Sequence, residues 1–184
     1  MFKSLRKRFR RDDKGVAAIE FAMVAPVFLM ALGVIVETGL MLFSEYVLQS
    51  AVQEASRKIR TGQAQASAMS ASQFKGEICK LANVVMNCNG GVTVYVKSAV
   101  DFTALKAAIP SYLSVGASFG GAPSLTSYSC GGASQAVAVI ATYDWDFIMP
   151  GMGVYGNVDS DSKRRIAGFA MFLNEPFPTT TTCS

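Results

Sequence analysis

The longest apolar run in the chain is the feature that most limits its fold. It extends over residues 16–43, and the strongly polar or helix-breaking residues within it are Glu20, Pro26, Glu37 and Thr38. As a helix it would be about 42 Å long, more than the ~30 Å thickness of a membrane's hydrocarbon core. A secretory signal peptide has a shorter apolar core and a small-x-small cleavage site, which does not close this run. The run therefore predicts a transmembrane helix over about 16–43.

The basic residues of the chain are concentrated in front of this run. In residues 1–15, seven lysines and arginines outweigh two aspartates by five charges, whereas the whole chain carries +4. The other residues therefore sum to −1, which argues against a nucleic-acid-binding surface. Cations directly before a membrane helix hold that end in the cytoplasm. We expect a basic cytoplasmic leader over 1–15 and a head on the far side of the membrane.

Helical periodicity continues beyond the membrane segment and predicts one long helix over 16–62. Pro26 should kink this helix, because a proline inside a helix removes a backbone hydrogen bond and crowds the preceding turn. Glu54 and Lys58 have the spacing of an ion pair within the helix.

The two glutamates of the apolar run differ in their expected cost. Glu37 would lie about 31 Å along the helix from Val16, near the outer membrane surface, where a carboxylate costs little. Glu20 would lie within the membrane, where carboxylates are disfavoured and usually functional. On this basis only Glu20 is expected to need a partner.

The chain beyond residue 62 predicts a small α+β head over 63–175 and a threonine-rich tail over 176–184. Residues 63–72 have the composition of a linker or weak helix, and residues 114–132 that of a long Gly/Ser-rich loop. An amphipathic helix is expected over 73–85, burying Phe74, Ile78, Leu81, Ala82 and Val85. Asp101 should cap a second helix over 102–109. Strands are predicted over 92–96, 136–147 and 164–173, as an antiparallel meander packed against the long helix.

All four cysteines fall in the exported part: Cys79, Cys88, Cys130 and Cys183. An even number of cysteines in an oxidising compartment indicates two disulfides. Zinc is the weaker alternative, because the chain has no histidine and no C-x-x-C pair. Local pairing of Cys79 with Cys88 is the simplest choice and leaves Cys130 with Cys183, although four cysteines allow three connectivities.

No catalytic constellation is found, so the protein is not expected to be an enzyme. The absence of histidine removes the commonest general base. Asp144 and Asp146 could lie on one face of a strand. A calcium site or an acid pair is conceivable there, but we expect a solvated strand face. Asp159 and Asp161 lack the Gly and Glu of an EF-hand loop. We expect no metal and no cofactor.

The N-terminal part of the chain resembles a known family. A basic leader, the motif Gly15-x-x-x-x-Glu20-Phe21, the following apolar run and Pro26 within it resemble the TadE-like pseudopilins of the tight-adherence (Tad, Flp pilus) system, in the type IV pilin superfamily. The likeness continues through Ala55-Ser56-Arg57, Thr61-Gly62 and, near the end of the chain, Asn174-Glu175-Pro176-Phe177.

This resemblance implies a minor pilin or pseudopilin that takes part in assembling adhesive Tad/Flp-type pili, as a pilus-associated subunit or a tip or initiation component. A prepilin peptidase would cut between Gly15 and Val16, and Glu20 would then meet the new α-amino group of a neighbouring subunit. The implied partners are other pilins or pseudopilins and the inner-membrane assembly platform. The implied location is the bacterial inner membrane, with a periplasmic head, or the extracellular pilus.

The alternative function belongs to another class. The chain could be an uncleaved, single-pass inner-membrane protein whose periplasmic head is a sensor or binding module. The two hypotheses predict different N-termini in cells: Val16 after cleavage for a pilin, and Met1 for the uncleaved protein.

Overall fold

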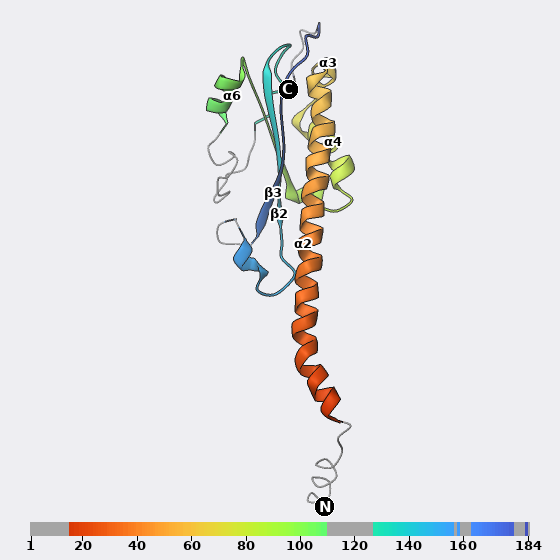
Figure 1. Ribbon diagram of the computed structural model, residues 1–184. Helices are drawn as coiled ribbons and strands as arrows, with labels where there is room; N and C mark the ends of the chain where they lie inside the picture. The colour runs from red at the N-terminus through yellow and green to blue at the C-terminus, as the bar shows by residue number, and fades with distance from the viewer. Residues whose placement is uncertain (1–14, 110–126, 157, 159–162, 179–182, 184) are drawn as a thin grey trace, which may run out of the picture.

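The computed structural model describes residues 15–109, 127–156, 158, 163–178 and 183. The predicted leader up to residue 14 and most of the predicted loop over 114–132 lie outside this part. The elements in chain order are α2 (Val16–Arg60), α3 (Gln63–Ala66), α4 (Ala71–Ala82), α5 (Cys88–Gly91), β1 (Val92–Ala99), α6 (Phe102–Ala108), β2 (Ala136–Trp145), the 3-10 helix η3 (Met152–Tyr155) and β3 (Arg164–Leu173). The C-terminal part of α2 packs on the head, and its N-terminal part projects away from it (Figure 1). The predicted α+β fold is confirmed.

The head is built on an antiparallel sheet with the order β1-β2-β3. In its central rows Val96 lies opposite Val139, and Val139 lies opposite Ala170. Consecutive strands are neighbours, so the predicted meander is confirmed. The central strand β2 is apolar and is buried on both faces over its first seven residues. Such a strand requires cover on both sides of the sheet.

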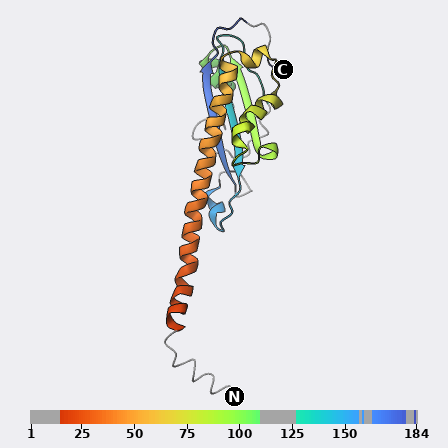
Figure 2. The ribbon, with the colours of Figure 1, turned by 90° about the vertical axis from the view of Figure 1, so that its right-hand side faces the viewer.

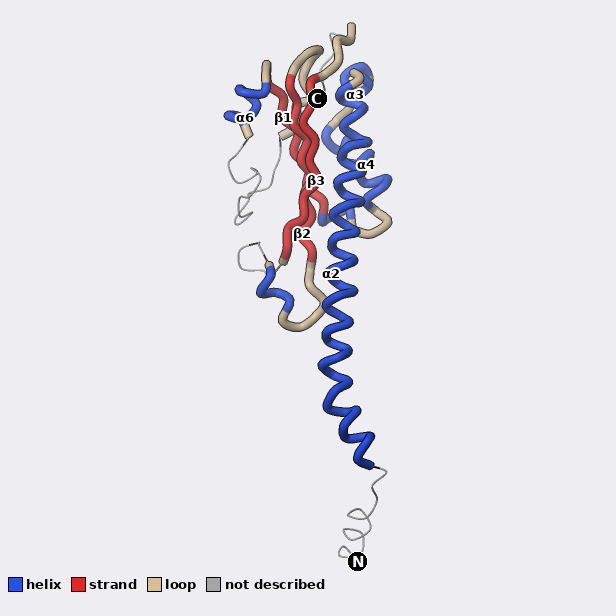
Figure 3. The backbone as a smooth tube through the Cα atoms, viewed as in Figure 1, coloured by secondary structure: helices blue, strands red, loops and turns tan. Residues whose placement is uncertain are grey.

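Two helices cover one face of this sheet, and α6 lies on the other (Figures 1 and 3). When the molecule is turned by 90°, α2 and α4 lie together in front of the strands (Figure 2). The core on this side joins fully buried residues of α2, α4 and β2, among them Leu48, Val52, Ile59, Phe74, Ile78, Val137 and Val139. On the opposite face Leu105 of α6 packs with Ala136 and Ala138. The C-terminal half of α2 is therefore part of the head's core.

The contact between α2 and β3 is close because a glycine lies there. A Cβ atom on Gly168 would be 2.9 Å from the Leu48 backbone oxygen, so any side chain would push the helix and the strand apart. Beside it, the side-chain amide of Gln49 donates to the Phe169 carbonyl and accepts from the Phe169 N–H, both at 2.9 Å. Gln49 thus satisfies the backbone of an edge strand at a point where another chain could otherwise pair with it.

The helix α4 begins two residues earlier and ends three residues earlier than the helix predicted over 73–85. Ser70 accepts from the Gln73 N–H while the Gln73 side chain accepts from the Ser70 N–H, which is a capping box. Phe74, Ile78 and Ala82 are buried as predicted. The prediction for Leu81 is wrong, since its side chain is 45% exposed. In a helix that ends at residue 82, the buried stripe runs through 74, 78 and 82, and residue 81 falls beside it.

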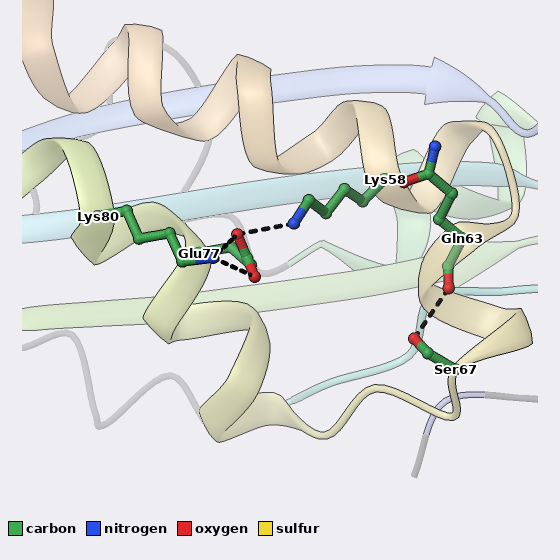
Figure 4. A network of polar contacts seen from close by, with 5 residues as sticks. All are labelled: Lys58, Gln63, Ser67, Glu77 and Lys80. Carbon is green, nitrogen blue, oxygen red and sulfur yellow. Dashed lines mark hydrogen bonds and ion pairs between the residues drawn. The ribbon is translucent and has the colours of Figure 1, made fainter.

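A small charge network holds α4 against α2 (Figure 4). The Lys58 ammonium lies 2.7 Å from the Glu77 carboxylate, and Lys80 lies 2.8 Å from it. The predicted partner of Lys58 is therefore wrong: Lys58 pairs with Glu77 of α4 rather than with Glu54 of its own helix. The hydrogen bond from Lys58, and then that from Lys80, lowers the pKa of Glu77 from its ordinary value of 4.5.

We expect Glu77→Gln to destabilise the protein by about 0.5–1 kcal/mol at neutral pH, as for other partly exposed pairs. Because the folded-state pKa is lowered, this stabilisation is present above pH 4.5 and is lost as the pH falls through the lowered pKa. Thermal unfolding of the full chain in detergent, followed at several pH values, measures the difference. Glu54→Gln removes the same charge from the exposed surface of α2 and should change little. A Glu77→Gln deficit that persists in acid would contradict the ion-pair explanation.

Candidate functional site

The N-terminal half of α2 has an unusual surface for a folded protein. From Val16 to Val36 the apolar side chains are exposed all around the helix, with only Ala25 and Gly33 half-buried. Within the described part of the chain, α2 is the helix long and apolar enough to cross a membrane. From Val16 to Val36 it rises about 30 Å, which is the thickness of a hydrocarbon core. This segment is compatible with a single-pass membrane protein.

Contact with the head begins inside the predicted membrane segment. The first buried residue of α2 is Glu37, followed by Met41 and Ser44. The predicted segment over 16–43 is therefore divided, and its last seven residues run alongside the head. On the side away from the head, however, Leu40, Leu42, Phe43 and Tyr46 are 50–71% exposed. The exposed apolar surface of α2 thus continues past the length that a membrane would cover.

The Gly15–Val16 peptide bond lies at the start of this helix. Gly15 is the N-cap residue, makes no side-chain cap, and is exposed, with no atom within 4 Å of where a Cβ would be. Its backbone is right-handed helical, with φ of −84° and ψ of −15°, a conformation open to any residue. Cleavage at this bond stays a prediction.

Glu20 lies one helical turn beyond Val16 and is exposed. No described cation lies within ion-pair distance of its carboxylate. Its proposed pairing with another subunit stays a prediction. In an apolar surrounding this carboxylate would need an external cation.

The expectation that Glu37 needs no partner is wrong. Its side chain is only 4% exposed, and its two carboxylate oxygens accept hydrogen bonds from the backbone N–H groups of Ile148 and Met149, the latter at 2.9 Å. These residues belong to the connection between β2 and β3, more than a hundred positions away. Sequence reasoning missed this contact because a backbone donor leaves no mark in the sequence. The signal that could have pointed to it is a second glutamate within an apolar run.

Gly33, one turn before Glu37, completes this attachment. A Cβ atom at position 33 would overlap the Met149 side chain, so the glycine leaves room for Met149 to lie on the helix. Glu37 and Gly33 together hold the β2–β3 connection against α2. We call this contact the loop clamp.

The residues near both ends of the head that resembled the family come together in space. Gly62 has a left-handed backbone, with φ of 79°, and the Phe177 ring would be 2.6 Å from a Cβ at that position. Asn174 is buried and donates to the Cys130 and Gly132 carbonyls, and the Glu175 N–H donates to the Arg60 carbonyl. The motif Asn174–Phe177 therefore closes over the C-terminal end of α2. Its role in the structure is to cap this helix.

Both disulfides form in the pairing that sequence spacing favoured. Cys79 of α4 bonds to Cys88 of α5, with 5.7 Å between the Cα atoms. Cys130 bonds to Cys183, with 5.9 Å between the Cα atoms, and ties the tail to the segment before β2. The Cys130 carbonyl also accepts from Gln65, next to the end of α2. The first disulfide thus joins α4 to α5. The second joins the tail to the segment before β2, and a buried hydrogen bond joins that segment to α3.

The acidic residues weighed as a calcium site form ion pairs across the sheet. Asp144 lies opposite Arg165 in the register and accepts two hydrogen bonds from its guanidinium, which raises the pKa of Arg165. Asp146 lies 3.2 Å from Lys163. Asp159 and Asp161 lie outside the described residues. Among the described residues no cluster of three possible metal ligands is found.

Most of α2 matches a known family. Residues 15–57 match the family model described as TadE-like protein, so this segment is TadE-like. The match begins at Gly15 and includes the exposed apolar half of α2, Glu20 and the loop-clamp residue Glu37. No curated protein and no solved structure is significantly similar to the chain.

Proposed function

We propose that this chain, with its TadE-like N-terminal segment, is a minor pilin or pseudopilin in the assembly of Tad/Flp-type adhesive pili. One observation carries the proposal above the others. The exposed apolar half of α2 starts at Gly15 and has a carboxylate, Glu20, one turn beyond the residue that cleavage would make the N-terminus. Such a helix suits both lipid and a bundle of similar helices. The subunit would act within the pilus, or as a tip or initiation component.

The basic leader supports an orientation for this helix. Seven cations within residues 1–15 would hold the N-terminus in the cytoplasm, so the head would be periplasmic. Two disulfides in the head agree with an oxidising compartment. A prepilin peptidase would remove the leader and leave the near-neutral mature chain in the inner membrane.

The mature N-terminus gives Glu20 its proposed role. Cleavage of the Gly15–Val16 bond creates an α-amino group, which is protonated near neutral pH. When helices pack together outside lipid, this ammonium on one subunit would meet the Glu20 carboxylate of a neighbouring subunit. Pairing compensates two charges that are each costly in an apolar bundle. The exposed side chains Leu40, Phe43 and Tyr46 would extend the same bundle contact beyond the membrane.

The N-terminal residue of the protein in membranes that contain the peptidase tests this function. We expect Val16 as the first residue, and Gly15→Val should leave the leader attached. Gly39→Val is the matched control, because a Cβ at either glycine meets no atom within 4 Å and neither change should disturb the fold. The control protein should be cleaved normally.

The uncleaved single-pass protein with a sensor or binding head predicts another result. In that case Met1 remains attached in the presence of active peptidase, and Gly15→Val changes nothing. That outcome would overturn the proposed pilin function.

A further inference from the structure

The connection between β2 and β3 lies at the end of the head nearest to the apolar half of α2 (Figures 1 and 2). It carries exposed apolar side chains. Ile148 is 79% exposed, Val154 80% and Tyr155 64%. Met152, between them, is buried and anchors the 3-10 helix η3. These three exposed side chains, which we call the loop tip, lie on an ordered turn and have no apolar cover from the described part of the chain.

The loop clamp fixes the height of this turn along α2. Gly33 and Glu37 lie about 26 and 31 Å from Val16 along the helix axis. Since Met149 packs at Gly33 and the Ile148 and Met149 N–H groups bind Glu37, the turn is held at this level. If the helix enters the membrane at Val16, this level is the outer edge of a ~30 Å hydrocarbon core.

We propose that the loop tip inserts into the outer headgroup and acyl boundary of the membrane that α2 crosses. The partner is therefore the lipid surface, and the inference rests on the proposed membrane insertion of α2. The head thereby makes a second, shallow membrane contact, which lies 111 or more residues after Glu37 in sequence.

Three features favour lipid as the occupant. The loop tip adjoins the exposed apolar surface of α2, so lipid that surrounds the helix also reaches the turn. Tyr155 has the amphipathic ring that is enriched at membrane–water interfaces. Next to it, the Arg164 guanidinium donates to the Tyr155 carbonyl, which places a cation where lipid phosphates would be. A protein partner would not require these three features to occur together at the level of the membrane edge, whereas contact with lipid does.

Tryptophan fluorescence tests this contact, because Trp145 is the one tryptophan in the chain. In a Trp145→Phe background, the full chain is reconstituted into phosphatidylethanolamine/phosphatidylglycerol vesicles with either ordinary or brominated acyl chains. Bromine quenches tryptophan on contact. Val154→Trp reports on the loop tip, and Phe28→Trp reports on the part of α2 that would lie within the membrane. Val100→Trp is the matched control, since Val100 is 76% exposed and follows β1 at the opposite end of the sheet.

We expect brominated lipid to quench the Val154→Trp and Phe28→Trp proteins and to leave the Val100→Trp protein unchanged. Lipids brominated near the headgroup should quench the Val154→Trp protein most, because interfacial segments lie only about 5–10 Å deep. Lipids brominated near the chain ends should quench the Phe28→Trp protein most.

The other outcomes overturn the inference in distinguishable ways. Quenching of Phe28→Trp alone means that α2 spans the membrane while the loop tip does not touch it. Blue-shifted but unquenched emission from Val154→Trp means that protein covers the loop tip. Equal quenching of Val154→Trp and Val100→Trp means that the head lies on the membrane without a specific contact. If Phe28→Trp is unquenched, the proposed membrane insertion fails as well.

Discussion

Replacing Glu37 with alanine is expected to free the β2–β3 connection from α2. The substitution removes both acceptors of the Ile148 and Met149 N–H groups and leaves these partly buried donors unpaired. An unpaired buried donor or acceptor costs about 1–3 kcal/mol, more where a charged group took part. We therefore expect the free energy of opening at this loop to fall by about 1–3 kcal/mol, which is roughly five- to a hundredfold in an exchange rate.

Hydrogen exchange of the Ile148 and Met149 amides measures this opening directly in the full chain. Glu45→Ala is the control, because Glu45 is exposed on the same helix and its removal should leave both amides protected. Glu37→Gln keeps one acceptor oxygen and should give an intermediate rate. Unchanged exchange in Glu37→Ala would mean that the loop is held to α2 by Met149 packing alone.

Replacing Glu20 with alanine should abolish pilus assembly while membrane insertion is retained. Insertion should persist because the change removes a charge from an apolar helix. Assembly should fail because the N-terminal ammonium of a neighbouring subunit would be left unpaired in the bundle. Breaking one partner of a buried pair costs about 3–5 kcal/mol, or at least a hundredfold in the affinity of each subunit contact.

Surface pili and the membrane content of the subunit should be measured in the same cells. Glu45→Ala again removes one negative charge from α2, but beyond the membrane segment, and should assemble normally. Normal piliation with Glu20→Ala would show that the carboxylate has no role in packing. Loss of the subunit from the membrane would instead mean that the variant fails before assembly.

The two glutamates of the apolar run thus illustrate different solutions to one physical problem. Glu37 is satisfied within the chain by backbone donors of the head. Glu20 is exposed and has no cation partner among the described residues. On the proposed function, this carboxylate would pair with the N-terminal ammonium of another subunit.

Local patterns were sufficient to predict most of the elements. The long helix, the Asp101 cap on α6 and the strand Arg164–Leu173 follow from periodicity and capping chemistry, and each is present. The disulfide Cys79–Cys88 follows from its short loop. These features depend on residues a few positions apart, which is the range over which sequence patterns carry information.

Contacts between distant segments were harder to predict. Lys58 binds Glu77 rather than Glu54, since α4 brings a carboxylate closer than the helix itself does. Gly62 and Phe177 both belong to the segments that resemble the family, but their contact forms only because the C-terminal part of the chain returns to the end of α2. Glu37 was expected near the outer membrane surface with no need of a partner, on the basis of its distance along the helix. Its partners are backbone N–H groups, which any residue could supply, so its own sequence position does not reveal them.

The sequence by itself determined that a basic leader precedes an apolar helix, that this helix continues into an α+β head, and that Glu20 is a charge at odds with its surroundings. These conclusions rest on composition and period, which the linear order of residues contains. Only the tertiary structure decided where the head starts along the helix and that the β2–β3 turn lies beside Gly33 and Glu37. Those positions depend on the packing of β3 against α2, where the missing side chain of Gly168 sets how closely the strand and the helix approach.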